Sequence, residues 1–126
     1  MDWEFSVSVL RSMFAALPTT LSLAAVSFVL SLLLAVVIAG IDYFKVPVLR
    51  QVCAVYVSFF RGTPLIVQLF IIFFGLPSVG IVLDAFPSAV IVFALNLGAY
   101  NAEIFRSAIQ AVPQGQTEAA YMIGLN

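Results

Sequence analysis

Histidine is absent from this chain of 126 residues, and cysteine occurs only once. A structural or catalytic metal site needs several histidine, cysteine or carboxylate ligands at suitable spacing, and the sequence contains no such group. The lone Cys53 cannot form an internal disulfide, so we expect it to fill space in a helix. We therefore expect neither a metal ion nor another cofactor.

Charge is also scarce, since charged residues make up 9% of the chain and hydrophobic residues 63%. A soluble chain of this length cannot cover its surface with so few charges, which predicts a membrane protein. The net charge of −1, without a basic cluster, argues against nucleic acid as a partner. The single lysine, Lys45, does not follow a glycine-rich turn, which excludes a P-loop for ATP. No nucleophile–base pair is present, so an enzyme is a poor interpretation.

Three apolar segments are long enough to cross a membrane as helices, which takes roughly 20 residues each. They cover about residues 18–40, 55–75 and 87–112. Pro18 and Pro87 suit the first turns of the first and third helices, and Pro113 is expected to stop the third. The predicted fold is therefore all-α, with three transmembrane helices.

Positive charges predict the orientation of these spans. The side that holds the first loop and the C-terminal tail carries Lys45, Arg50, Arg61 and Arg106, whereas Arg11 alone lies on the other side. The positive-inside tendency places that loop and the tail in the cytoplasm and the N-terminus outside.

One stripe of small side chains follows the first span, because Ser27, Ser31, Ala35 and Ala39 are four residues apart. Small residues at this spacing let two helix backbones approach closely. Membrane helices often show such a stripe by chance, so we interpret it as a packing face and no more.

Two ionisable side chains fall inside predicted spans, where each costs roughly 2.5–3.5 kcal/mol at the bilayer centre. Counting along straight helices places Arg61 about 21 Å and Glu103 about 24 Å from the outer boundary. We hypothesise that these two side chains pair between the second and third helices. The alternative is that each one snorkels separately to the inner interface. Arg106 is expected to act only as an interfacial anchor.

The sequence Arg61-Gly62-Thr63-Pro64 predicts a break in the second span. Proline removes a helix donor and disfavours helical geometry at Thr63, and Gly62 loosens the backbone. Thr63 could then cap a new helix, whose exposed N–H groups could hold a carboxylate. A simple proline kink is the alternative.

Polar side chains also follow one face of the third helix, at Asn96, Tyr100, Glu103 and Ser107. Counting from Pro87 places Asn96 roughly 13 Å into the membrane, near its middle. Such a stripe either lines a polar path or hydrogen-bonds a neighbouring helix, and the residues alone leave both open.

Three stretches combine several polar residues with glycine or proline: residues 60–70 (FRGTPLIVQLF), residues 98–109 (GAYNAEIFRSAI), and residues 112–120 (VPQGQTEAA) with Gly124. Together they resemble the type I ABC permeases that import polar amino acids, the histidine/glutamine/arginine type. Each stretch holds several uncommon residues at fixed spacing, and their order also fits the family. An EAA tripeptide alone would be weak evidence, because it is common in soluble helices.

The resemblance implies that residues 113–126 begin the EAA loop, a cytoplasmic coupling helix that fits into a cleft of the ATPase. After Pro113, a glycine would allow a sharp turn into this helix, a glutamate would give it a fixed charge, and small residues would offer a face to grip. The residues expected to couple to the ATPase are Gly115, Glu118, Ala119, Ala120 and Gly124.

The resemblance further implies a permease subunit of an ATP-driven amino-acid importer, a multi-pass protein of the bacterial cytoplasmic (inner) membrane. Its partners would be an ABC ATPase dimer, a second permease subunit (identical or homologous), an extracytoplasmic amino-acid-binding protein, a polar amino acid and membrane lipid. ATP would be hydrolysed in the separate ATPase chain. Residues expected along the substrate path or in buried polar positions are Arg61, Thr63, Asn96, Tyr100 and Glu103.

Members of that family continue past the EAA loop, so the chain is expected to be a partial type-1 ABC transmembrane domain over residues 1–126. It would be either a fragment or a genuinely short product. The alternative function is a short three-span membrane protein without transport activity. Such a protein would assemble with, or interfere with, a full-length permease through the Ser27–Ala39 stripe.

Overall fold

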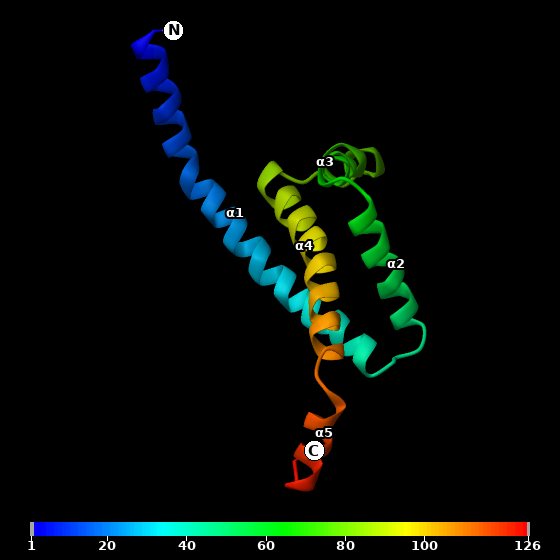
Figure 1. The fold of residues 1–126 in the computed structure, drawn as a ribbon. Helices are drawn as coiled ribbons and strands as arrows, with labels where there is room; N and C mark the ends of the chain where they lie inside the picture. The colour runs from blue at the N-terminus through cyan, green and yellow to red at the C-terminus, as the bar shows by residue number, and fades with distance from the viewer. Residues whose placement is uncertain (1, 126) are drawn as a thin grey trace.

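The computed structural model describes residues 2–125, and all regular structure within that range is helical (Figure 1). Met1 and Asn126, the two ends of the predicted domain, lie outside the described residues. The helices in chain order are α1 (Trp3–Tyr43), α2 (Leu49–Gly62), α3 (Leu65–Phe70), a π-helical segment η1 (Ile71–Gly75), a 3-10 helix η2 (Leu76–Val79), α4 (Ala85–Gln110) and α5 (Gln114–Met122).

The first helix starts earlier than the sequence suggested. α1 contains 41 residues, which makes it about 60 Å long, twice the thickness of a hydrocarbon core. Pro18, expected in the first turn, lies in the helix interior. The prediction was wrong because no glycine or proline between Trp3 and Leu17 interrupts the helix. Figure 1 shows this N-terminal part extending away from the other helices.

The core lies where α1 crosses α4, the most extensive helix contact in the described structure. Ser27, Ser31, Ala35 and Ala39 are between 0% and 7% exposed, so the stripe is confirmed as a packing face. α4 meets it with small residues of its own, including the buried Gly98, Ala99 and Ala102. Small side chains on both helices allow the close approach.

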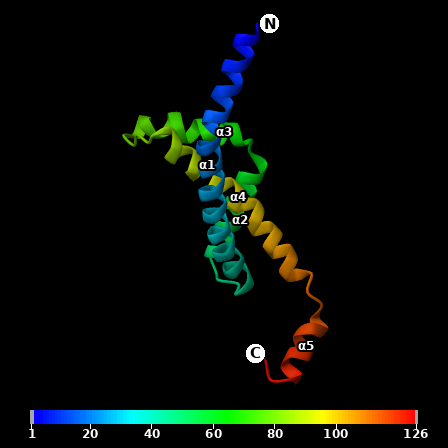
Figure 2. The same ribbon diagram turned by 90° about the vertical axis from the view of Figure 1, so that its left-hand side faces the viewer.

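The second predicted span is not a straight helix. α2 and the segment Leu65–Val79 are bent by 109° relative to each other. α2 alone has 14 residues, about 21 Å, and is too short to cross a core of about 30 Å. In Figure 2, α3 and the turns after it run across the long helices rather than along them. Only α1 and α4, among the described helices, are long and apolar enough to span a membrane by themselves.

The remaining boundaries lie near their predicted positions. α4 begins at Ala85, so Pro87 is in its first turn as predicted, and it ends at Gln110, shortly before Pro113. The end of the second segment is displaced, because the chain stays helical past Gly75 and turns at Gly80 with a φ of +89°. Glycine adopts this left-handed conformation without steric cost.

Candidate functional site: a polar seam between α2, α3 and α4

A buried glutamine closes the break in the second segment. Gln68 on α3 is 3% exposed, and its side-chain nitrogen donates to the carbonyls of Phe60 and Thr63, both at 3.0 Å. The Phe60 carbonyl would normally accept from the N–H of residue 64, but Pro64 has none. The Gln68 amide therefore replaces the hydrogen bonds that the break removes.

Thr63 does not cap α3 as expected. It is the C-cap of α2, with φ −114° and ψ 136°, and its hydroxyl donates back to the Phe59 carbonyl at 2.7 Å. Pro64 occupies the N-cap position of α3, and its carbonyl accepts from the N–H groups of Val67 and Gln68. The expected break is confirmed, but the capping role of Thr63 is wrong because the hydroxyl forms a bond within α2 instead.

The polar stripe of α4 faces this break. The side-chain nitrogen of Asn96 donates to Oε1 of Gln68 at 3.1 Å. One turn later, the Tyr100 hydroxyl lies 3.4 Å from the Arg61 carbonyl, and the Arg61 guanidinium lies 5.7 Å from the centre of the Tyr100 ring. Asn96 and Tyr100 thus hydrogen-bond the neighbouring segments, one of the two roles expected for the stripe.

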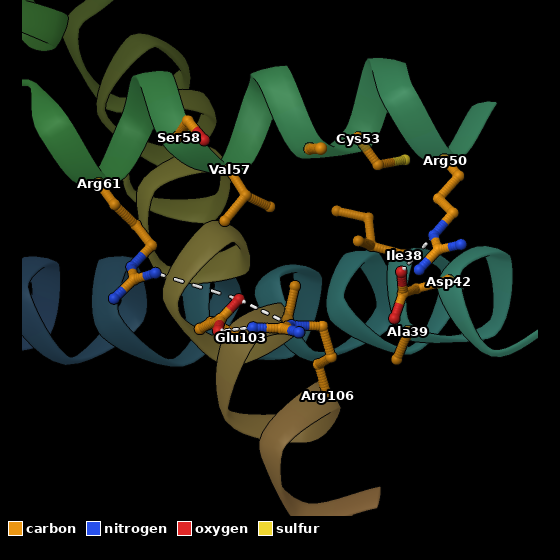
Figure 3. A pocket seen from close by; sticks show the side chains of 12 residues that line it. Ile38, Ala39, Asp42, Arg50, Cys53, Val57, Ser58, Arg61, Glu103 and Arg106 are labelled. Carbon is orange, nitrogen blue, oxygen red and sulfur yellow. Dashed lines mark hydrogen bonds and ion pairs between the residues drawn. The ribbon is translucent and has the colours of Figure 1, made fainter. Parts of the chain in front are cut away.

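Glu103 lies between two arginines (Figure 3). We call the polar residues that join α2, α3 and α4 the polar seam: Arg61, Gln68, Asn96, Tyr100 and Glu103. Oε2 of Glu103 is 4.0 Å from Nη1 of Arg61, so the hypothesised pair is present, at the limit of an ion-pair distance. Arg106 donates from Nε to Oε2 at 3.2 Å and makes a second contact to Oε1. Arg106 is therefore not only an interfacial anchor, because a spacing of three residues places it beside Glu103 on the helix.

The depth predicted for Arg61 assumed a straight helix from Arg61 to Gly75. The chain turns by 109° directly after α2, so that count no longer applies. The pairing with Glu103 survives because both side chains lie on the part of the seam where α2 runs beside α4.

A groove of about 410 Å³ opens beside these charges, between α1, α2 and α4. Figure 3 shows Arg61, Glu103 and Arg106 at one part of it and a second ion pair, Asp42 with Arg50, at another. The Arg50 Nε lies 3.0 Å from Asp42 Oδ1. Apolar side chains such as Ile38 and Val57 lie between the two charged groups. The groove can accept a ligand that carries both charged and apolar parts.

Sequence reasoning missed three contacts that hold α4 against the other helices. Gln68 could have been found, because it is the sole polar side chain between Leu65 and Gly75 and closely follows the proline break. The Tyr56 hydroxyl donates to the Leu95 carbonyl, for which the sequence carries no signal. Asn101 donates to the Ser31 hydroxyl at 3.1 Å, and its interruption of an apolar surface was a usable signal.

All the predicted coupling residues except Gly124 lie on α5, which stands apart from the crossing helices (Figures 1 and 2). Glu118 and Ala119 are exposed, and Ala120 is partly exposed. Gly115 does not form the expected turn, since it lies within the helix, and Pro113 in extended conformation makes that turn. Gly124 has the left-handed φ of +86° that ends α5, with the Leu125 N–H bonded to the Ala120 carbonyl.

Residues 31–126 match the family described as the binding-protein-dependent transport system inner membrane component. The chain belongs to this permease family. Its curated relatives include the L-cystine transport system permease protein TcyB of Bacillus subtilis (strain 168), 53% identical over 84% of this chain and 45% of TcyB. The probable amino-acid ABC transporter permease protein PatM of Vibrio harveyi is 42% identical over 98% of this chain and 57% of PatM.

A solved structure carries the same fold. The crystal structure of an amino acid ABC transporter with histidines matches 100% of this chain and 59% of that chain, at a TM-score of 0.89 and 35% identity. This permease chain is therefore an all-α membrane protein with the type I ABC permease fold. It spans about half the length of the curated relatives it matches.

Proposed function

We propose that this chain is a permease subunit of an ATP-driven amino-acid importer, and that α5 docks on a separate ABC ATPase. The observation that carries the proposal is α5 itself, a short exposed helix directly after α4. Within residues 2–125, no other helix packs against α5 as extensively as α1 packs against α4. Its exposed surface is therefore available to a partner protein. Membership of the permease family supports the same reading.

The polar seam supports a role in the translocation path. Arg61 and Glu103 keep 45% and 26% of their side chains exposed, and Tyr100 is 42% exposed. A guanidinium and a carboxylate at this separation offer partners for the carboxylate and the ammonium of an amino acid. Thr63 and Asn96 would hold the neighbouring segments in position. The Thr63 hydroxyl bonds the Phe59 carbonyl, and the Asn96 amide bonds the Gln68 side chain. Relatives named for L-cystine and arginine transport support a polar amino acid as the substrate class.

The proposed topology follows from the charges. The α1–α2 loop and α5 would face the cytoplasm and the N-terminus the outside of a bacterial inner membrane. α2 and the bent segment after it would together take the place of the second span. The further partners would be a second permease subunit and an extracytoplasmic amino-acid-binding protein.

Docking of α5 can be tested by capture of the tagged chain from bacterial inner membranes, with mass spectrometry of what is bound. We expect an ABC ATPase in the captured complex and its loss in Ala119→Trp, because tryptophan enlarges the small face of α5. Ala15→Trp, on the exposed N-terminal part of α1, is the matched control and should keep the ATPase. Capture without an ATPase, or equal loss in both variants, would contradict the docking role.

Transport itself needs a separate measurement, which is uptake of labelled amino acid after reconstitution with an ATPase and a binding protein. ATP-dependent uptake supports the importer, and its absence favours the short membrane protein without transport activity. In that alternative the contact would have to use another surface, because α4 of the same chain covers the Ser27–Ala39 stripe.

A further inference from the structure

A second hollow adjoins the groove of Figure 3, and its lining carries a larger net positive charge because it has fewer carboxylates. It measures about 290 Å³ and lies where the α1–α2 loop meets the end of α4. Lys45, Arg50 and Arg106 line it together with Asp42 and Tyr43. Asp42, Arg50 and Arg106 also line the larger groove, so the two hollows form one continuous surface.

The cations on this surface outnumber the carboxylates. Lys45, Arg50, Arg61 and Arg106 face only Asp42 and Glu103 across the two hollows. Arg50 meets Asp42 through Nε alone, which leaves its terminal nitrogens as donors. Lys45 forms no ion pair with any residue in the range 2–125. The excess charge favours an anion.

An apolar furrow continues from the same surface. It measures about 340 Å³ and runs between α1 and α4, lined by residues that include Val36, Gly40, Phe105 and Ala108. Ala39, Tyr43 and Ile109 line both the furrow and the basic hollow, so the two are joined. A ligand that fills both must carry an anionic head and an apolar tail.

We propose that this surface binds an anionic phospholipid. The phosphate would lie among Lys45, Arg50 and Arg106, and an acyl chain would lie along the furrow beside Gly40. Basic pockets at the ends of membrane helices attract anionic headgroups, and each added cation strengthens that attraction. Free phosphate could use the cations but not the furrow, which is why the two hollows together indicate a lipid. The inference does not depend on transport or on an ATPase.

The test is native mass spectrometry of the full chain in detergent, titrated with dioleoylphosphatidylglycerol or with dioleoylphosphatidylcholine. We expect the anionic lipid to bind more tightly, and Lys45→Gln to weaken it about fivefold without changing the zwitterionic lipid. Arg11→Gln removes one positive charge at the far end of α1 and is the matched control. Equal binding of the two lipids, or equal loss in the two variants, would overturn the proposal.

A second variant tests the furrow. A Cβ at Gly40 would meet no atom within 4 Å, so Gly40→Leu should fill the furrow without disturbing the helices, as unchanged circular dichroism would verify. We expect it to weaken phosphatidylglycerol binding severalfold. Excess inorganic phosphate should displace little of the lipid. Full displacement by phosphate, or unchanged binding in Gly40→Leu, would show an anion site alone and sink the lipid assignment.

Discussion

The side-chain amide of Asn96 on α4 donates to Oε1 of Gln68 on α3 over 3.1 Å. This bond ties the long helix α4 to the place where the second segment breaks, because Gln68 also binds the carboxyl-terminal carbonyls of α2. A single buried amide thus connects three helical segments. The break is a fixed element of the fold rather than a loose kink, since its freed carbonyls have partners.

Gln68→Leu should destabilise the chain strongly. Leucine is similar in size but would leave the Phe60 and Thr63 carbonyls and the Asn96 amide without Gln68, at about 1–3 kcal/mol for each group left unsatisfied. The measurement is unfolding in detergent, followed by circular dichroism. Gln51→Leu, an exposed glutamine on α2, is the control. A loss no greater than that of the control would show that the amide does not hold the break.

Charge reversal at Arg61 and Glu103 should show whether the two side chains pair. Arg61→Glu or Glu103→Arg alone brings like charges together. Arg61→Glu should cost about 0.2–1 kcal/mol because the arginine is partly exposed, and Glu103→Arg should cost more because it also loses the contact with Arg106. The double reversal should restore only part of the loss, since Arg106 would then face an arginine at position 103. Adding Arg106→Glu should restore the rest. Thermal unfolding with strictly additive losses would rule the pair out.

Gly98→Ala should weaken the contact between α1, α2 and α4. A Cβ there would lie 2.8 Å from Cδ2 of Leu34 and 3.2 Å from the Tyr56 hydroxyl, and overpacking of this kind costs about 1–3 kcal/mol. In the background of Leu34→Ala, the same change should cost less, because the nearest atom is gone. Gly40→Ala, with open space around it, is the control. Unfolding free energies that show no coupling between positions 98 and 34 would contradict this packing.

Accessibility to a membrane-impermeant maleimide should report the proposed topology. In a Cys53→Ala background, Val82→Cys should be labelled in intact cells, whereas Glu118→Cys should be labelled only after the membrane is opened. Both positions are exposed in the structure, so a difference reflects the membrane and not burial. The reverse pattern would invert the proposed orientation of α5 and remove it from the side where an ATPase could dock.

Several features followed directly from local chemistry. The Ser27–Ala39 stripe, the break at Thr63-Pro64 and the first-turn position of Pro87 were all predicted, and the structure confirms them. Each depends on residues a few positions apart, whose geometry is set by the helix period or by the proline ring. The interior position of Pro18 was missed, because one proline does not stop a helix that the residues on both sides favour.

The sequence by itself determined a membrane protein made of helices, with a small-residue contact face and an interrupted second segment. The apolar composition indicates that the helices lie in lipid rather than in water, and residue spacing determines which side chains share a helix face. Only the tertiary structure decided that the interruption is a bend of 109°, that Gln68 closes it and that Arg106 shares Glu103 with Arg61. Those features depend on contacts between segments far apart in the chain, and a buried polar group takes whichever partner the packing brings within hydrogen-bond distance.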